Sequence, residues 1–516
     1  MQNPLKRPLA LVILDGWGIS HRTDGNAIAL AHTPNYDEIA ARFPRTSLAA
    51  SGTRVGLAPG MAGNADVGHM NIGAGRVVQT DSLRIADAIK SGIFNENAVI
   101  SDAFRSAVRD DRPVHFIGLV SDGEVHAAPE TLFELLRMAK RHGVKDAFVH
   151  AILDGRDVPQ RTADIYIEAL EIKMADIGIG CIATLCGRFL AMDNSENWER
   201  TARVFTMLVH AEGERASDPV MAVRNSFLRG LNDEFIAPIV IENENGQPVT
   251  RIADGDTVVF FNHRADTMRQ LARSIAVQGR TVHPLPAKPN VSVVCLTEYD
   301  RSLELPVAFP PDDHRNNLSD VLGAFNIHNY RIAESERFSH VTNFFNGIAD
   351  TADLFEHHIH VPAVGGESPD VFPEMRSFKI TDKLLRAIES DNKGVFIANF
   401  AAPGIGAESG DLGRAVEAVQ YVDTCLGGVV SKMREAGGIT LITSTHGGCE
   451  EMIRSEAGKP GSPFTLNDVP FHLIDHRSLC GSLTPGGSLE DIAPTILGLI
   501  GIEKPAEMTG RDLRGS

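Results

Sequence analysis

The sequence has few cysteines, no long apolar run and no excess of positive charge, and each lack excludes a class of protein. The six cysteines among 516 residues include no CxxC pair, and this density is too low for a disulfide scaffold. The first apolar run, Leu9–Leu14, is too short for a signal peptide and ends in Asp15. No apolar stretch reaches the length of a membrane span. We therefore expect a cytoplasmic chain without a membrane partner.

Positive charge is in deficit, with 49 Lys and Arg against 67 Asp and Glu and a formal net charge of -18. The phosphates of a nucleic acid would be repelled by this charge, so we expect no nucleic-acid partner. A small anionic substrate remains compatible, because a local cluster of arginines can override the global sign. The sequence also has no Walker A, GxSxG or HExxH motif, which excludes the enzyme classes that these motifs mark.

The chain instead alternates short apolar runs with helical patterns. The clearest helix is predicted from Asp411 to about Ala436, where apolar residues recur at helical spacing until Gly437-Gly438. Strands and helices in alternation predict an α/β fold with parallel sheets covered on both faces. Eight apolar runs predict buried strands: Pro8–Leu14, Val114–Val120, Ala147–Leu153, Cys181–Leu185, Thr257–Phe261, Val291–Leu296, Gly394–Phe400 and Ile439–Thr443.

Two places have the composition of domain junctions. One follows the glycine-rich stretch near Gly73–Gly75, and the other is the Pro-rich and acidic segment Phe309–His314. If both are junctions, the middle third of the chain is an inserted domain. We therefore predict a discontinuous domain of residues 1–79 and 313–516, interrupted by a second α/β domain of residues 80–312.

Two predicted strands of the discontinuous domain end in polar residues. Asp15 closes the first strand, where a carboxylate is either a metal ligand at the carboxyl edge of the sheet or a turn-forming residue before Gly16. His446 follows the strand Ile439–Thr443 and is a metal ligand, a base or a satisfied core residue. The segment Gly63–Arg76 reads as a loop rich in Gly and Asn, which either lets the backbone approach a ligand or forms a turn cluster.

Four strand ends in the middle domain place an Arg or a His beside other polar residues. Guanidinium groups match the oxygens of carboxylates and phosphates, so several arginines at one sheet edge predict a clamp for an anion. A single arginine of this kind is usually part of a surface ion pair. The four segments are Ser121–His126, Asp154–Asp157, Gly187-Arg188 and Asn262–Asp266.

With these motifs assembled, the chain resembles the cofactor-independent (2,3-bisphosphoglycerate-independent) phosphoglycerate mutases of the alkaline phosphatase superfamily, nearly end to end. The most specific segments are Leu14–Gly18 (LDGWG), Val67–Arg76 (VGHMNIGAGR), Leu153–Val158 (LDGRDV), Thr297–Asp300 (TEYD), His340–Gly347 (HVTNFFNG) and Pro373–Met375. The resemblance implies an alkaline-phosphatase-like parallel-sheet domain with two metal ions, usually manganese, and a serine nucleophile. It also implies an inserted domain that binds phosphoglycerate.

The resemblance carries the family's substrate-binding residues onto several positions of this chain. In the inserted domain these positions are His126, Arg156, Asp157, Arg188 and Arg264. Two further arginines of the family pattern are replaced here, one by Asn194 and one by Thr267. The family's lysine that assists phosphoryl transfer falls at Arg337, which is a candidate for both substrate binding and catalysis.

The metal-binding half departs much further from the family pattern. The nucleophilic serine falls at Ala65, and two of the metal ligands fall at Gly404 and Phe464. Asp15, His446 and Glu408 remain as residual metal candidates, and His446 is also a catalytic candidate. Three or four protein ligands are usual for a metal site, so manganese is expected to bind weakly or not at all.

Three hypotheses follow. The first is a pseudoenzyme that binds a phosphorylated three-carbon acid, or a protein partner, without the dimetal phospho-serine reaction. The second is a repurposed phosphoryl or phosphonyl transferase that acts on a glycerate-like substrate, with Asp15, His446, Glu408 or Glu450 as acid, base or ligand. The third is a working mutase of glycolysis with an unusual site, for which Ser444 and Thr445 are the nearest hydroxyls.

Overall fold

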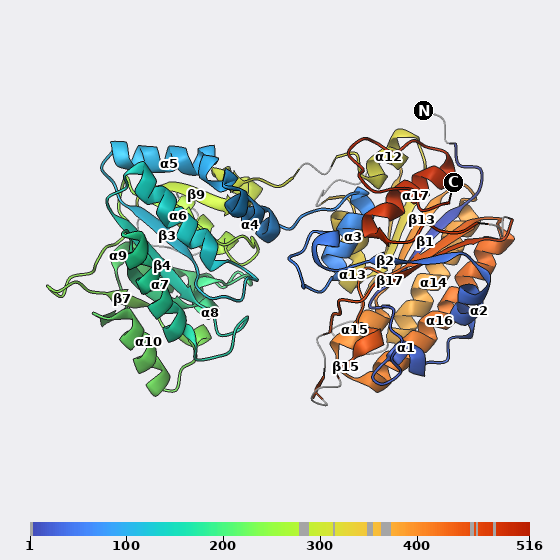
Figure 1. Ribbon diagram of the computed structural model, residues 1–516, viewed down its shortest axis with the longest axis horizontal. Helices are drawn as coiled ribbons and strands as arrows, with labels where there is room; N and C mark the ends of the chain where they lie inside the picture. The colour runs from blue at the N-terminus through green and yellow to red at the C-terminus, as the bar shows by residue number, and fades with distance from the viewer. Residues whose placement is uncertain are drawn as a thin grey trace. The chain divides into compact units, whose positions relative to one another are not determined.

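The computed structural model describes residues 4–277, 288–312, 315–347, 354–362, 373–454, 459–460, 463–477 and 481–515. The chain divides into two compact units. Residues 1–80 and 313–516 form unit 1, and residues 81–312 form unit 2. Each unit contains its own eight-stranded sheet (Figure 1).

Unit 1 is built around the order β12-β11-β13-β1-β14-β17-β2-β18. The central strand β1 pairs in parallel with β13 and β14, and β17 runs antiparallel to both β14 and β2. The strands are β1 (Leu9–Leu14), β2 (Arg45–Ala49), β11 (Asn329–Glu334), β12 (Glu356–Val361), β13 (Val395–Phe400), β14 (Ile439–Thr443), β17 (Val469–Asp475) and β18 (Gly487–Ser488).

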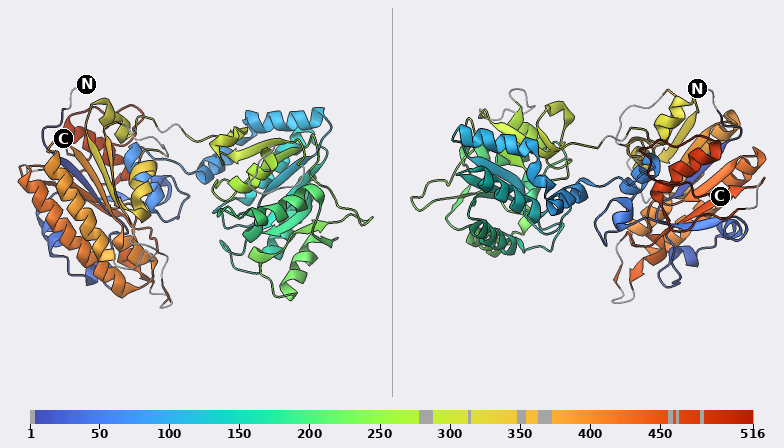
Figure 2. Two further views of the ribbon diagram at one scale, coloured as in Figure 1. Left: turned by 180° about the vertical axis from the view of Figure 1, so that it is seen from behind. Right: turned by 45° about the horizontal axis from the view of Figure 1, so that its top comes forward.

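Helices cover both faces of this sheet (Figure 2). The side chains of β1 alternate between the two faces. Leu9, Leu11 and Ile13 pack into the core with α3, α12 and α17. Ala10, Val12 and Leu14 pack with α2, α14 and α16 on the opposite face. The helices are α2 (Pro34–Arg42), α3 (Ala65–Ala74), α12 (Leu318–Ala324), α14 (Pro373–Ser390), α16 (Leu412–Glu435) and α17 (Ile492–Ile500). Burial on both faces explains why β1 is a continuous apolar run.

Unit 2 repeats this plan with the order β10-β9-β8-β3-β4-β5-β7-β6 and one hydrophobic core. Its neighbouring strands are parallel except for β5 and β7. The strands are β3 (Val114–Leu119), β4 (Ala147–Leu153), β5 (Cys181–Gly187), β6 (Glu214–Ala216), β7 (Ile239–Ile241), β8 (Thr257–Phe260), β9 (Ser292–Thr297) and β10 (Val307–Phe309). The longer helices are α4 (Asp81–Ser91), α5 (Ala98–Arg109), α6 (Pro129–His142), α7 (Ala163–Ile177), α9 (Trp198–His210), α10 (Pro219–Leu228) and α11 (Arg269–Ala276).

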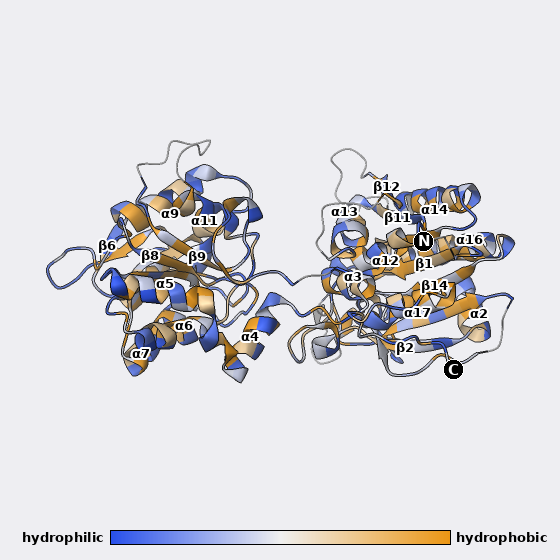
Figure 3. Ribbon diagram, turned by 90° about the horizontal axis from the view of Figure 1, so that it is seen from above, coloured by the Kyte–Doolittle hydropathy of each residue, from blue (hydrophilic) through white to orange (hydrophobic). Residues whose placement is uncertain are grey.

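Several shorter elements complete the two units. They are α1 (Ala27–Leu30), α8 (Arg188–Ala191), α13 (Ser335–Ser339), α15 (Ala402–Glu408), the π-helical turn His340–Phe344 and the hairpin of β15 (Ile453–Arg454) and β16 (Lys459–Pro460). In both sheets the central strands are the most hydrophobic part of the unit (Figure 3). None of the helices in the described part of the chain combines the length and the apolar character that a membrane span requires.

The α/β prediction is confirmed, and all eight predicted strands are present, two of them with the predicted bounds (β4 and β14). The helix predicted from Asp411 is α16, and the Asp411 side chain caps it by accepting a hydrogen bond from the Arg414 amide at 3.1 Å. The sheets are mixed rather than wholly parallel. Strand β17 reverses direction because no α-helix lies between it and β14 in the described residues, and a parallel return needs such a crossover.

The reading of Gly63–Arg76 as a loop is wrong, because residues 65–74 form α3. The Asn64 side chain caps this helix by accepting from the Val67 amide at 3.0 Å, and Gly75 ends it with a positive φ of 63°. The glycines within the helix serve close packing instead of turns. A Cβ atom at Gly68 would collide with Thr445, and one at Gly73 would collide with the Phe345 carbonyl.

Candidate functional site

The first candidate site lies at the carboxyl edge of the unit 1 sheet. Asp15 directly follows β1, and Thr445 and His446 lie just after β14. Because β1 and β14 pair in parallel, with Ile13 opposite Thr443, the two strands end side by side. The side chains of all three residues are buried, with at most 1% of each residue exposed. The edge therefore carries a compact, water-excluded polar cluster, as the carboxyl ends of strands in open α/β sheets commonly do.

Arg337, from α13, joins two carboxylates of this cluster. Its Nε donates to Asp15 Oδ2 at 2.5 Å, and its Nη2 donates to Glu408 Oε1 at 2.8 Å. Burial by itself raises the pKa of Asp15, but the attraction of Arg337 outweighs it and leaves this pKa well below its usual value. The same two carboxylates raise the pKa of Arg337 in spite of its burial. Asp15 is therefore a carboxylate and Arg337 a cation at any ordinary pH.

The other Asp15 oxygen is bound by Thr445, which in turn contacts His446. Thr445 Oγ1 donates to Asp15 Oδ1 at 3.0 Å and lies 2.9 Å from His446 Nδ1. A hydroxyl has one proton, and Thr445 donates it in the hydrogen bond to Asp15. His446 Nδ1 must therefore be the donor in its contact with Thr445. Burial lowers the pKa of His446 to about 4, which keeps the ring neutral near pH 7. His446 Nε2 thus carries the lone pair of the ring.

Ala65, the predicted position of the family's nucleophile, is the first residue of α3 and is buried. The first turn of α3 packs against Thr445 through Gly68. The neighbouring Asp66 pairs with His340 Nε2 at 2.7 Å, and this hydrogen bond lowers the pKa of Asp66. The methyl group of Ala65 offers neither a hydroxyl for phosphorylation nor an oxygen for a metal.

The described side chains do not fit the metal ions that the resemblance implies. Gly404, the position of one expected carboxylate, packs so tightly on Asp15 that a Cβ there would lie 3.0 Å from Asp15 Cβ. Phe464, the position of an expected histidine, instead lies edge-on to His446 with ring centroids 5.1 Å apart. Within the described ranges, no three His, Cys, Asp or Glu side chains are grouped so that they could hold a metal ion. Residual metal binding by Asp15, His446 and Glu408 stays a prediction.

The second candidate site lies in unit 2 and centres on Arg188, which follows β5. Its Nη1 donates to Asp154 Oδ1 at 2.7 Å and to Asp157 Oδ2 at 2.6 Å, and its Nη2 lies 2.8 Å from His126 Nε2. Because the guanidinium is only a donor, His126 Nε2 must accept. Burial, and then the positive charge of Arg188, lower the pKa of His126 to about 4, so this ring is also neutral.

Thr267 completes the contacts of His126. Its Oγ1 lies 3.2 Å from His126 Nδ1, the ring nitrogen opposite the one that accepts from Arg188. The position expected to hold an arginine thus contributes a neutral hydrogen bond to the cluster. Arg188, Asp157 and His126, three of the five predicted binding residues of this unit, are brought together in the structure.

The other two predicted binding residues of unit 2 lie apart from this cluster. Arg156 is exposed at the turn after β4. Arg264 is also exposed, with 52% of its side chain accessible, and its Nε donates to Asp266 at 2.8 Å. Two exposed arginines beside a buried Arg–Asp–His cluster are suited to meet an anion from solvent, although Arg264 would have to exchange its contact with Asp266 for the anion.

Asp154 is a central residue of this cluster that was not singled out from the sequence. It accepts from Arg188, from Ser121 Oγ at 2.6 Å and from the amides of Arg156 and Asp157 at 3.1 and 3.0 Å. Its place directly after β4, within the LDGRDV segment, is the signal that could have identified it. The carboxylate holds together three of the strand ends that carry binding residues.

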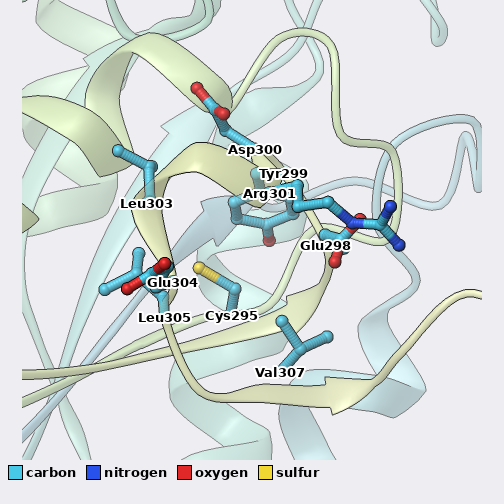
Figure 4. Close-up of a pocket in the computed structure, with 9 residues that line it drawn as sticks. All are labelled: Cys295, Glu298, Tyr299, Asp300, Arg301, Leu303, Glu304, Leu305 and Val307. Atoms are coloured by element: carbon cyan, nitrogen blue, oxygen red, sulfur yellow. The ribbon is translucent and has the colours of Figure 1, made fainter. Parts of the chain in front are cut away.

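The TEYD segment, residues 297–300, holds the backbone of the segment that carries Arg264 and Thr267. Tyr299 Oη donates to the Asn262 carbonyl at 2.6 Å, and Thr297 Oγ1 donates to the His263 carbonyl at 2.9 Å. The His263 amide then donates to the His126 carbonyl at 2.8 Å. The cavity beside Tyr299 is about 30 Å³, room for a single water molecule, so it is no substrate site (Figure 4).

Fold and site together define a two-unit α/β protein with a mainly parallel sheet in each unit and polar side chains at the carboxyl ends of its strands. Residues 85–301 match the family described as BPG-independent PGAM N-terminus (iPGM_N). The chain is 45% identical over 509 residues to the 2,3-bisphosphoglycerate-independent phosphoglycerate mutase of Desulforudis audaxviator, covering 98% of this chain and 99% of that protein. It is 43% identical over 510 residues to the Moorella thermoacetica protein of the same name, covering 99% and 98%. The chain belongs to the family of 2,3-bisphosphoglycerate-independent phosphoglycerate mutases.

A solved relative has the same fold. The structure of Leishmania mexicana phosphoglycerate mutase, described at low cobalt concentration, superposes with a TM-score of 0.73 at 26% identity. The superposition covers 99% of this chain and 98% of that one. The family resemblance and the fold class inferred from the sequence are thus confirmed. That the catalytic and metal-binding positions of the family fall at Ala65, Gly404 and Phe464 stays a prediction from the sequence.

Proposed function

We propose that this chain binds a phosphorylated three-carbon acid, 3-phosphoglycerate or a close analogue, in unit 2 and does not pass its phosphoryl group through a phosphoserine. The observation that carries the proposal is the contrast between the assembled Arg188 cluster and the alanine at position 65. The cluster holds one buried arginine, two aspartates and a neutral histidine, with Arg156 and Arg264 exposed nearby. Arginines in this arrangement suit the carboxylate and phosphate of such an acid.

The unit 1 contacts support the second half of the proposal. A phospho-serine mechanism needs a hydroxyl next to groups that neutralise the transferred phosphoryl oxygens. At this edge the cation, Arg337, is already paired with Asp15 and Glu408. Ser444 Oγ donates to the His446 carbonyl at 2.8 Å and accepts from the Trp17 amide at 3.2 Å, so it has a structural role. We place the protein in the cytoplasm, as expected from the sequence, and a protein partner stays a prediction.

A working mutase is the second candidate, and the full-length relatives named as mutases at 40–45% identity favour it. Within this chain the Thr445 hydroxyl is the group to consider, because it lies 2.9 Å from His446 Nδ1. Thr445 is poorly placed as a nucleophile, because it is 0% exposed and its hydroxyl is bonded to Asp15 on one side and to His446 on the other. The repurposed transferase hypothesis uses the same groups on another substrate.

Titration calorimetry and phosphorus NMR on the full chain separate these candidates. We expect saturable binding of 3-phosphoglycerate and no formation of 2-phosphoglycerate, with or without added manganese. The Arg188→Met variant should lose the binding, and Arg109→Met, in an exposed pair with Asp110 in the same unit, should keep it. Turnover to 2-phosphoglycerate that is lost in Thr445→Val would instead establish the mutase. A screen of other phosphorylated or phosphonylated glycerates by the same NMR assay tests the transferase.

A further inference from the structure

The guanidinium of Arg337 spans two carboxylates that come from different elements of unit 1. It reaches from α13 to Asp15 at the end of β1 and to Glu408 at the end of α15. We propose that Arg337 is a permanent internal cation that takes the place of a divalent metal ion in unit 1. Unit 1 then folds without a metal ion and takes up none at Asp15. This inference does not depend on which ligand unit 2 binds.

Asp15 has both of its carboxylate oxygens committed to protein donors. Oδ2 accepts from Arg337 at 2.5 Å and Oδ1 accepts from Thr445 at 3.0 Å, while the residue is 0% exposed. A divalent ion at Asp15 would have to break at least one of these hydrogen bonds in a buried setting. A carboxylate that is already neutralised by a fixed guanidinium gains little from a second cation.

The charge of Arg337 also opposes a metal ion directly. A divalent cation bound between Asp15 and Glu408 would occupy the space of the guanidinium or lie next to it, where like charges repel. Glu408 keeps 38% of its side chain exposed, so it remains reachable from solvent as a single carboxylate. One exposed carboxylate is far short of the three or four ligands that a tight site needs.

Two of the positions expected to hold ligands carry residues that cannot bind a metal ion, Gly404 and Phe464. Gly404 packs against Asp15, and Gly16 packs against Gly404, where a Cβ at Gly16 would lie 2.8 Å from the Gly404 Cα. A side chain at position 404 would therefore require Asp15 to shift by a few tenths of an ångström. The Phe464 ring lies edge-on to His446 with ring centroids 5.1 Å apart, and a phenyl ring supplies no metal ligand.

Metal content and thermal unfolding of the full chain test the proposal. We expect the wild-type protein, after dialysis against EDTA and then against manganese, to retain no stoichiometric manganese by electron paramagnetic resonance. Its Tm should be the same with EDTA and with manganese. Arg337→Met should unfold roughly 5–10 °C lower, because Asp15 loses its partner. Arg42→Met removes an arginine from an exposed pair with Glu38 in the same unit and is the matched control, with an unchanged Tm.

Manganese should raise the Tm of Arg337→Met and leave that of Arg42→Met unchanged. If Arg337→Met does not fold, two other variants carry the test. Arg337→Lys keeps the cation and should remain indifferent to manganese, and Asp15→Asn with Arg337→Met removes both charges and should fold without manganese. Stoichiometric manganese in the wild-type protein, or a wild-type Tm that falls with EDTA, would overturn the proposal. So would an Arg337→Met Tm equal to that of Arg42→Met.

Discussion

In unit 1 the charged groups at the sheet edge are buried and paired with one another, whereas in unit 2 two of the three predicted binding arginines extend into solvent. Arg337 is held by Asp15 and Glu408, and the nearby Thr445 and His446 close the cluster. In unit 2 only Arg188 is buried, while Arg156 and Arg264 are exposed. The difference teaches that arginines at the same type of sheet edge can either be paired with buried carboxylates or be exposed to solvent, where an anion can reach them. A buried pair satisfies its own charge, and an exposed cation does not.

Removing the central arginine of unit 2 is expected to have the largest effect. Arg188→Met should lower the free energy of unfolding by about 3–5 kcal/mol, because Asp154 would be left buried without its cation. It should also abolish binding of 3-phosphoglycerate. Urea unfolding and calorimetry measure the two effects, with Arg109→Met as the control. A fully stable Arg188→Met variant that still binds the acid would show that Arg188 is needed neither for the buried cluster of unit 2 nor for binding.

The neutral histidine of unit 1 should make stability depend on pH. The pKa of His446 is about 4 in the folded protein against about 6.5 when exposed, so between these pH values the unfolded chain binds a proton that the folded chain does not. Stability therefore falls as the pH is lowered from 6.5 to 4. In His446→Gln this fall should be smaller by roughly 2–3 kcal/mol.

Denaturant unfolding at several pH values checks this prediction. His69 is also buried, with a pKa of about 4, so the variant should reduce the pH dependence without removing it. His21→Gln, at an exposed position of the same unit, is the control and should leave the dependence unchanged. An unaltered pH dependence in His446→Gln would mean that this ring is not neutral in the folded protein.

Removing the Tyr299 hydroxyl, which holds the backbone next to the unit 2 site, should have a smaller effect on stability and binding. Tyr299→Phe removes only the hydrogen bond to the Asn262 carbonyl and should cost about 1 kcal/mol of stability. Because that segment leads to Arg264 and Thr267, affinity for 3-phosphoglycerate should weaken by a few fold. Calorimetry on the variant measures it, and unchanged affinity would show that the segment is held by its other contacts.

The smallest effect is expected for a substitution at position 65 of unit 1. Ala65→Ser restores a hydroxyl at the start of α3, yet it should yield no phosphorylated protein and no 2-phosphoglycerate, since Arg337 stays paired with Asp15. Mass spectrometry after incubation with 3-phosphoglycerate and manganese is the measurement. A phosphoserine at position 65 would show that the unit 1 site is still competent.

Much of the fold could be predicted from the sequence, because buried strands leave a direct trace. Strands such as β1 and β4 are covered on both faces and are therefore continuous apolar runs. The short or half-exposed strands β2, β6 and β12 leave no such trace and were not predicted. For α3 the glycines and asparagines of the sequence predict a loop, because these residues commonly form turns, but here they serve packing and capping.

The sequence by itself determined the α/β class, the family and the residue types at each strand end, including the alanine at position 65. These follow from local apolar patterns and from motifs that occupy consecutive residues. Only the tertiary structure decided that Arg337 meets Asp15 and Glu408, which lie 322 and 71 residues away along the chain. It also decided that Arg188 is buried with Asp154 while Arg264 pairs with Asp266. Two charged groups pair when they lie close together in space. For residues far apart along the chain, such as Arg337 and Asp15, that distance is set only when the strands assemble into the sheet.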